Sequence, residues 1–417
     1  MYRWLYSLLL YLYIPFELIR LLRRSRKAPD YKKRWGERFA STLPNCDKPV
    51  IWFHTVSVGE TLAALPVIRR VIQDNPDKQV LVTTMTPTGS ERVQATLGDS
   101  VCHCYAPYDL PHALNRFYEH LKPECLFIME TELWPNMIHH ASKRNIPIVL
   151  MNARMSEKSA RDYQRFSTLT RFMLGNLAQI AVQNETDANR FKRLGASDDQ
   201  LSITGNIKFD LTIPDDLNEK VKTLKKSLSD RPIWLAASTH KGEDEIILNA
   251  HKEILQKTPD CLLILVPRHP ERFNDVYKLC EEFPMEVSRR SSLSLPRGQV
   301  YLADTMGELL LFCALADMAY VGGSLVETGG HNCLEVAAFK KPAMSGPYDF
   351  NFAEINKQLK ASGGLVYVSG SHSIADQVIS WIEQPEKARQ VGEAGFSVVQ
   401  KNRGALQRLL EILNQYL

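Results

Sequence analysis

Carboxylates follow two short apolar runs in the first half of the chain, where they could transfer protons. Glu60 follows the run VIWFH through a turn that contains Ser57 and Gly59, and Glu130 follows the run CLFIM. Lys208 closes a further run, LSIT. A carboxylate placed against a substrate hydroxyl can act as a general base, which contributes roughly 10² to 10⁴ in rate. Because an acid at a helix start is also typical of a dipole and capping partner, both interpretations of Glu60 stay open.

A glycine-rich segment in the second half, YVGGSLVETGGHNCLE at 320–335, could hold a phosphate. Glycines let backbone amides approach a phosphate closely, and a helix that begins behind them offers unpaired N–H groups. Glu335 would lie one turn into that helix, where its two carboxylate oxygens could accept hydrogen bonds from ribose hydroxyls. An ordinary glycine-rich turn with a capped helix is the alternative. The first small residues of the segment are Gly322, Gly323 and Ser324.

Other polar residues follow apolar runs of the second half. Arg268 and His269 come after CLLILVP, and a guanidinium there can pair with a phosphate or a carboxylate, or form a simple loop salt bridge. The loop 305–308 precedes another predicted helix. The chain contains neither GxGxxG nor GxxxxGK[ST], which argues against classical dinucleotide binding and P-loop phosphoryl transfer.

The cysteines predict neither a disulfide framework nor a metal site. Eight cysteines in 417 residues are too sparse for a disulfide-rich fold, and several lie in apolar stretches. The cluster Cys102-His103-Cys104 resembles half of a zinc site, but no partner stands at ligand spacing, so we expect it to pack in the core. We expect no metal and no cofactor.

Short apolar runs alternate with helical periodicity from residue 31 onward, which predicts parallel strands covered by helices on both faces. A polar stretch at 210–230 interrupts the pattern. We therefore predict an α/β protein of two doubly wound, Rossmann-like domains, 29–214 and 215–417, the second including the C-terminal helices. Ligands of such sheets bind beyond the carboxyl ends of the strands, so Glu60 would face a cleft if the two sheets oppose each other. Strands are expected at 50–54, 79–84, 101–105, 125–129, 147–152, 179–182, 201–204, 233–237, 261–266, 299–302, 318–321, 342–344 and 365–368; helices include 111–121 and 156–174.

The N-terminal segment 1–28 is predicted to be a membrane anchor with a basic flank. Fifteen of the 19 residues from Trp4 to Leu22 are apolar, and RRSRK follows. The run suits a short span or an interfacial helix, with the rest of the chain on the cytoplasmic side; a buried core helix is the alternative. Residues 1–38 carry ten Lys or Arg and three acids, whereas the rest carries 41 and 44, so nucleic-acid binding is not expected.

Eight ordered blocks resemble the 3-deoxy-D-manno-octulosonic acid (Kdo) transferase family, the lipid A glycosyltransferases of Gram-negative bacteria. The resemblance covers essentially the whole chain and implies a GT-B fold, an inverting, metal-independent transfer from CMP-β-Kdo, and a lipid IVA-type acceptor at the inner membrane. The blocks are HTVSVGE (54–60), METELWPN (129–136), NARMSEKS (152–159), GNIKFD (205–210), PRHPERF (267–273), DTMGEL (304–309) and VGGSLVETGGHNCLE (321–335), together with the N-terminal apolar segment.

The resemblance also implies roles for individual residues. Glu60 would be the general base, and Glu130 and Lys208 would support the transition state. Another GT-B transferase or a sugar-nucleotide 2-epimerase, which would bind UDP, and a non-catalytic membrane-surface protein remain as alternatives. Contacts to CMP would come from Arg268, His269, Met306, Gly307, Glu308, Asn332, Cys333, Leu334 and Glu335.

Overall fold

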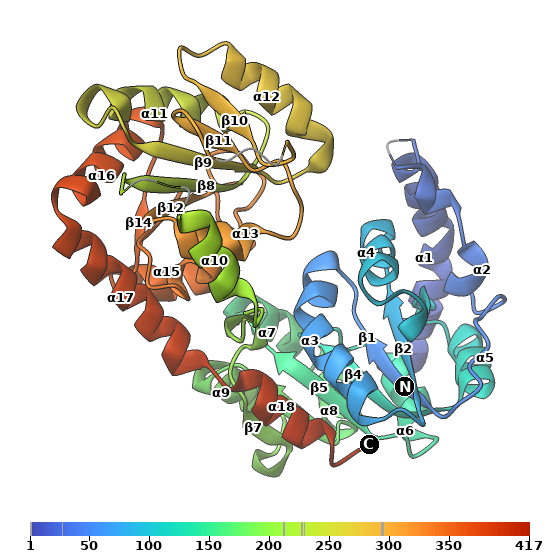
Figure 1. Cartoon of the computed structure of the whole chain (residues 1–417). Helices are drawn as coiled ribbons and strands as arrows, with labels where there is room; N and C mark the ends of the chain where they lie inside the picture. The colour runs from blue at the N-terminus through green and yellow to red at the C-terminus, as the bar shows by residue number, and fades with distance from the viewer. Residues whose placement is uncertain (1, 27, 212, 227, 229, 293–295) are drawn as a thin grey trace. The chain divides into compact units, whose positions relative to one another are not determined.

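Two seven-stranded sheets organise the chain, and every strand pairing in the described residues is parallel (Figure 1). The computed structural model describes residues 2–26, 28–211, 213–226, 228, 230–292 and 296–417. Met1 and Lys27 of the predicted anchor lie outside the described residues. Unit 1 comprises residues 1–210 and 403–417, and unit 2 comprises residues 211–402. The α/β prediction and the two doubly wound sheets are therefore confirmed.

Unit 1 has the strand order β3-β2-β1-β4-β5-β6-β7. Its strands are β1 (Val50–His54), β2 (Gln79–Thr84), β3 (Cys102–Tyr105), β4 (Pro123–Met129), β5 (Ile148–Ala153), β6 (Gln179–Val182) and β7 (Leu201–Ile203). Its helices are α1 (Tyr2–Arg24), α2 (Trp35–Arg38), α3 (Val58–Asp74), α4 (Pro87–Leu97), α5 (Pro111–Leu121), α6 (Pro135–Ser142), α7 (Glu157–Arg165), α8 (Ser167–Gly175), α9 (Glu185–Leu194) and α18 (Ala405–Leu413).

Unit 2 has the strand order β10-β11-β9-β8-β12-β13-β14. Its strands are β8 (Ile233–Thr239), β9 (Leu262–Pro267), β10 (Val287–Arg289), β11 (Val300–Leu302), β12 (Met318–Val321), β13 (Ala343–Ser345) and β14 (Leu365–Tyr367). Its helices are α10 (Leu217–Lys225), α11 (Asp244–Lys257), α12 (Phe273–Glu281), α13 (Leu309–Leu315), α14 (Leu334–Ala337), α15 (Ala353–Ala361), α16 (Ser371–Glu383) and α17 (Pro385–Asn402).

The apolar runs are continuous because the central strands are buried on both faces. In β1 all five residues are buried; Trp52 enters one core cluster of unit 1, and its neighbours Ile51 and Phe53 enter another on the opposite face. Cys102 and Cys104 pack in the first of these clusters, as predicted.

The structure differs from the sequence predictions in three places. The helix predicted at 156–174 is two helices, α7 and α8, that separate at Phe166, where the Thr170 hydroxyl donates to the Tyr163 carbonyl. The short, half-buried edge strand β10 was not predicted. The C-terminal residues 403–417 belong to unit 1 rather than to the second domain, because α18 packs against α3, β5 and β6.

Candidate functional site

Both sheets contain a topological switch point, where the strand order reverses. It lies between β1 and β4 in unit 1 and between β8 and β12 in unit 2. Loops that follow the two central strands diverge there, which leaves room for a ligand. Glu60 follows β1, Glu130 follows β4, and the glycine segment follows β12, so these predicted site residues stand at the switch points of their own units.

Glu60 lies in the first turn of α3 and exchanges hydrogen bonds with Ser57, the N-cap residue. The Ser57 hydroxyl accepts from the Glu60 N–H at 3.2 Å and donates to Oε1 at 2.7 Å, and the Val56 N–H donates to Oε2 at 2.9 Å. Only 8% of the surface of Glu60 is exposed. The capping interpretation of Glu60 therefore describes its local contacts.

The pKa of Glu60 also agrees with the other interpretation, in which this residue is a general base. Burial raises the pKa of Glu60 to about 7, although the two hydrogen bonds to its carboxylate act in the opposite direction. The charges of Glu132 and Glu130 raise the pKa further, so three carboxylates lie within electrostatic reach of each other. A carboxyl group with a pKa near 7 can take up and release a proton at neutral pH.

Glu130 stands directly after β4 in a left-handed backbone conformation, with φ 54°. Such strain in a residue with a side chain is typical of functional sites. Its Oε1 accepts from Lys208 Nζ at 3.1 Å and its Oε2 accepts from Arg154 Nε at 2.7 Å. The structure thus brings Lys208 to Glu130 and Glu130 to Glu60. It also brings in Glu132, which follows the same apolar run as Glu130, and Arg154, for which the only sequence signal was its place inside a resembling block.

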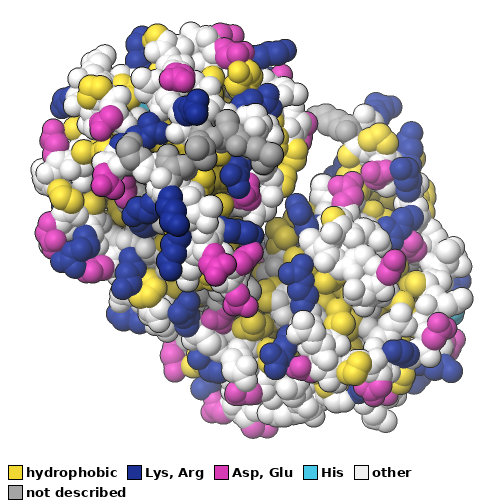
Figure 2. Space-filling model, in the orientation of Figure 1, with side chains coloured by type: hydrophobic (Ala, Val, Ile, Leu, Met, Phe, Trp, Pro, Cys, Tyr) yellow, Lys and Arg dark blue, Asp and Glu magenta, His cyan; other side chains and the backbone are white. Residues whose placement is uncertain are grey.

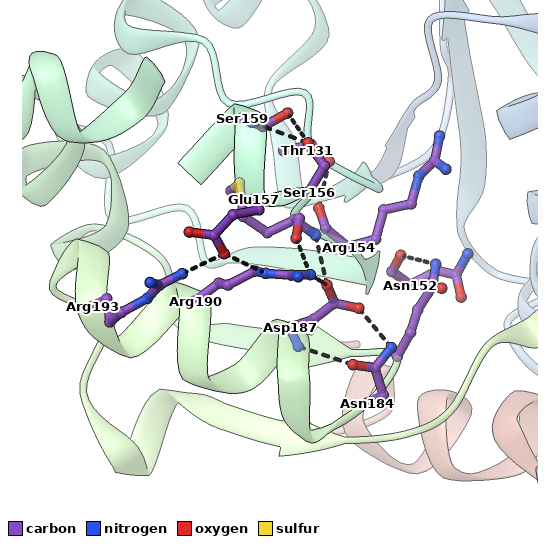
Figure 3. A network of polar contacts seen from close by, with 12 residues as sticks. Thr131, Asn152, Arg154, Ser156, Glu157, Ser159, Asn184, Asp187, Arg190 and Arg193 are labelled. Carbon is purple, nitrogen blue, oxygen red and sulfur yellow. Dashed lines mark hydrogen bonds and ion pairs between the residues drawn. The ribbon is translucent and has the colours of Figure 1, made fainter. Parts of the chain in front are cut away.

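The loop that carries Arg154 is held by a polar network with α9 (Figure 3). The Asp187 carboxylate accepts from the Met155 N–H at 2.9 Å, and Arg190 donates to the Met155 carbonyl at 2.8 Å. The Thr131 hydroxyl donates to the Arg154 carbonyl at 2.7 Å and so ties the loop after β4 to the loop after β5. These contacts fix the backbone from which Arg154 reaches Glu130.

Arg268 and three histidines form a cluster in unit 2. The rings of His240 and His331 stack with their centroids 5.1 Å apart and their Nε2 atoms 2.8 Å apart, and His269 lies edge-on to His240. Burial lowers the pKa of His331 to about 3 and also lowers the pKa of His240. Because these two rings are neutral at pH 7, Arg268 is the cluster's permanent positive charge. It forms no salt bridge with any described residue, which leaves its guanidinium open to an anion.

Glu335 lies in the short helix α14, within electrostatic reach of Arg268. Burial raises the pKa of Glu335 to about 7, and the charge of Arg268 acts in the opposite direction. Within the described part of the chain, its carboxylate makes no hydrogen bond, although its backbone N–H donates to Asn332. An unsatisfied carboxylate in this position can accept hydrogen bonds from a ligand's hydroxyl groups.

The prediction that the amides of Gly322, Gly323 and Ser324 hold a phosphate is wrong. The Gly322 N–H donates to the Ala237 carbonyl at 2.8 Å. The N–H groups of Gly323 and Ser324 donate to the carboxylate of Glu243 at 2.7 and 3.0 Å. Glu243 is completely buried, so the N–H groups of this loop supply the hydrogen bonds that its carboxyl group needs and are not free for a bound phosphate.

The other residues predicted to contact CMP differ in how far they are exposed. Cys333 and Leu334 are completely buried, backbone included, so neither residue is exposed to a ligand in this structure. Met306 is 56% exposed in the loop before α13. The next residue but one, Glu308, is engaged within unit 2, because Arg290 donates to both of its carboxylate oxygens at 2.7 and 3.0 Å.

Known proteins resemble this chain over its full length. Residues 33–211 match the family described as 3-deoxy-D-manno-octulosonic-acid transferase, and residues 230–398 match glycosyl transferases group 1. A 3-deoxy-D-manno-octulosonic acid transferase of Haemophilus influenzae is 45% identical, with 100% of this chain and 99% of the relative covered. The Bordetella pertussis transferase of the same name is 30% identical, covering 100% and 99%.

A solved structure resembles the chain in fold alone. The UDP-GlcNAc 2-epimerase of Neisseria meningitidis, bound to UDP-GlcNAc, gives a TM-score of 0.54 at 16% identity. The similarity covers 88% of this chain and 100% of the epimerase.

Proposed function

Since the chain belongs to the Kdo transferase family and is a glycosyltransferase, we propose that it transfers Kdo from CMP-β-Kdo to a lipid IVA-type acceptor in lipopolysaccharide core synthesis. The observation that carries the proposed mechanism is the carboxylate cluster of unit 1. In that cluster Glu60 has a pKa of about 7 and lies within reach of Glu130, which is paired with Lys208 and Arg154.

The cluster supports an inverting displacement. Glu60 takes the proton of the acceptor hydroxyl as the hydroxyl oxygen forms a bond to the anomeric carbon of Kdo, and the bond from that carbon to the CMP phosphate oxygen breaks. CMP leaves with the electron pair of the broken bond. Lys208 is a cation of this cluster and stabilises the negative charge that develops in the transition state. Glu130 orients Lys208 through the 3.1 Å hydrogen bond between them.

The residues of unit 2 suit the donor. Arg268 binds the phosphate of CMP or the carboxylate of Kdo. His240 and His331 are neutral and share one hydrogen bond between their Nε2 atoms, so the ring that accepts this bond keeps an N–H at Nδ1 that can donate to the same anion. Glu335 accepts hydrogen bonds from the ribose hydroxyls. The loop 306–308 and the half-buried Asn332 complete the proposed nucleotide site.

The acceptor explains the N-terminal helix. Among the described residues, α1 is the one helix that is long and apolar enough to cross a membrane. A lipid acceptor resides in a bilayer, so we place the enzyme at the cytoplasmic face of the inner membrane, held there by α1 and its basic flank.

The test is incubation of the purified protein with CMP-Kdo, generated in situ, and a lipid IVA analogue. We expect the mass of the lipid to increase by whole Kdo residues, and calorimetry to show binding of CMP but not of UDP. A lipid of unchanged mass together with binding of UDP would contradict the proposal and favour a different nucleotide sugar.

A further inference from the structure

Helix α1 contacts the rest of unit 1 through one narrow strip, which we call the docked strip, and through Tyr11, whose ring stacks on His112 of α5. Its buried and half-buried positions recur every three or four residues, so they lie on one side of the helix. They pack against α6 and α8. The docked strip consists of Arg3, Tyr6, Ser7, Leu10, Ile14, Glu17, Leu18 and Leu21.

Helix α1 differs from a helix of a soluble protein, which exposes its polar side and buries its apolar side. The docked strip contains Arg3, Ser7 and Glu17, and the last two are buried. Eleven large apolar residues of α1 are exposed, by 42 to 69% of their surface. A contiguous exposed apolar surface of this kind indicates contact with an apolar medium. These residues are Tyr2, Trp4, Leu5, Leu8, Leu9, Tyr11, Leu12, Tyr13, Phe16, Ile19 and Leu22.

Buried polar contacts fix the N-terminal end of α1 to unit 1. Arg3 donates to Asn136 Oδ1 at 2.8 Å, and Asn136 Nδ2 donates to the Ser7 hydroxyl at 3.0 Å. Asn136 is completely buried at the start of α6, where its N–H donates to Asp109 at 3.0 Å. Removing α1 would take away both partners of the Asn136 side-chain oxygen, Arg3 and Ser7, and the loss of these hydrogen bonds is costly.

The other end of α1 is docked too, because Leu21 is 3% exposed and belongs to the core of unit 1. Arg3 and Leu21 are 18 residues apart, which is about 27 Å along a helix. That distance is close to the roughly 30 Å thickness of the hydrocarbon layer. A helix that crossed the bilayer would therefore either lose the whole docked strip or draw α6 and α8 into the lipid.

We propose that α1 lies in the plane of the membrane interface and does not cross the bilayer. Its exposed apolar residues enter the acyl boundary of the cytoplasmic leaflet, while the docked strip holds unit 1 on the other side of the helix. Exposed Arg23, Arg24 and Arg26 stand at the end of α1 that leads toward α2, where Figure 2 shows Lys and Arg side chains gathered, and they suit anionic headgroups. The inference rests on the membrane location proposed above and specifies its geometry.

Spin-label depths on the full-length protein, bound to vesicles of zwitterionic and anionic phospholipid, test the geometry. Single cysteines replace Trp4, Leu8, Leu12, Phe16 or Ile19, all along the exposed side, in a background where the half-buried Cys46 is serine. The other native cysteines are buried. Asp198→Cys, at a side chain that is 82% exposed, is the control for a label in water.

We expect five similar depths, each roughly 5–10 Å into the boundary between headgroups and acyl chains. A spanning helix would instead place the label at position 12 about 12 Å deeper than the label at position 4, at 1.5 Å per residue. That profile, or labelling of Tyr2→Cys by an impermeant maleimide from outside intact cells, would overturn the in-plane geometry and leave the membrane location standing. Absence of vesicle binding would overturn both.

A charge test is independent of the labels. Replacing Arg23 and Arg24 by glutamine should weaken binding to anionic vesicles about 30-fold, since each basic residue near such a surface contributes roughly fivefold. Binding to purely zwitterionic vesicles should not change. Equal affinity of the variant and the parent for anionic vesicles would contradict the proposed contact between this end of α1 and the headgroups.

Discussion

Substitution of Glu60 by glutamine separates the proposed catalytic role of this residue from its capping role. The change keeps the size of the side chain and removes its ability to take a proton. We expect kcat of E60Q to fall by roughly 10² to 10⁴, the usual contribution of a general base. In the parent enzyme, kcat/KM should rise with pH up to about 7, because the pKa of Glu60 is raised to about 7 and only the ionised form accepts a proton. This inflection should vanish in E60Q.

The same substitution should stabilise the protein at alkaline pH. Burial raises the pKa of Glu60 from 4.5 to about 7, so the folded state binds this proton more tightly than the unfolded chain does. The stabilising contribution is complete below pH 4.5 and is lost as the pH rises through 7. The difference between the two pKa values corresponds to about 3 kcal/mol. The amide NH2 group of glutamine cannot accept one of the two hydrogen bonds that the carboxylate accepts, and this loss offsets about 1 kcal/mol of the gain. E60Q should therefore be about 2 kcal/mol more stable than the parent at pH 8.5.

Substitutions of two residues near Glu60 should shift the inflection in the pH dependence of kcat/KM in opposite directions. Ser57→Ala removes a hydrogen bond to the carboxylate that lowers the pKa of Glu60, so the inflection should shift to higher pH by about one unit. Glu132→Gln removes a repelling charge that raises the same pKa, so the inflection should shift to lower pH. Initial rates of transfer from CMP-Kdo at pH 5.5–8.5, and urea unfolding at pH 5 and 8.5, measure both effects.

Two results would refute the reasoning. Near-parental activity of E60Q would show that Glu60 is only a helix cap. An E60Q variant that is inactive but also less stable than the parent at pH 8.5 would show that the buried carboxylate of Glu60 does not destabilise the folded protein at that pH. The loss of activity would then have a structural cause.

The remaining predictions concern Lys208 and unit 2. Lys208→Met should lower kcat about 100-fold or more, with CMP affinity unchanged by calorimetry, because it removes the cation paired with Glu130; unchanged kcat would exclude that role. Arg268→Gln should weaken CMP binding by roughly 10- to 100-fold, the value of a charged hydrogen bond, and unaltered binding would remove Arg268 from the donor site. Tyr320→Phe removes the 2.6 Å hydrogen bond to buried Glu243 and should cost about 1.5–3 kcal/mol in urea unfolding, whereas Tyr348→Phe, at a residue 40% exposed, should cost almost nothing.

Much of the unit 1 cluster could be predicted from the sequence, because parallel sheets impose a simple rule. Strands buried on both faces appear as continuous apolar runs, and the residues that follow them gather at one edge of the sheet. Glu60 and Glu130 each follow such a run, β1 and β4 are adjacent, and the two side chains lie within electrostatic reach. Arg154 follows β5 in the same way, but nothing in its local pattern distinguishes it from an ordinary surface arginine.

The glycine segment shows where local patterns fail. Paired glycines indicate that another group approaches the backbone closely, and a Cβ at Gly322 would indeed lie 2.6 Å from the Ser238 carbonyl oxygen. The pattern cannot identify that group, because a buried carboxylate and a phosphate require the same N–H donors. The carboxylate comes from Glu243, 80 residues before Gly323, and its burial is decided by tertiary packing.

The return of α18 to unit 1 makes unit 2 an insertion in the chain of unit 1. Ala405, Leu409 and Leu413 complete the apolar core on one face of the unit 1 sheet, so a fragment ending at residue 210 would expose that face and should aggregate. The two points of insertion are adjacent, because the Asp210 carboxylate accepts from the Gly404 N–H at 2.8 Å. A short linker from residue 210 to residue 403 could therefore replace unit 2 and leave a foldable scaffold onto which the corresponding unit of another transferase could be grafted.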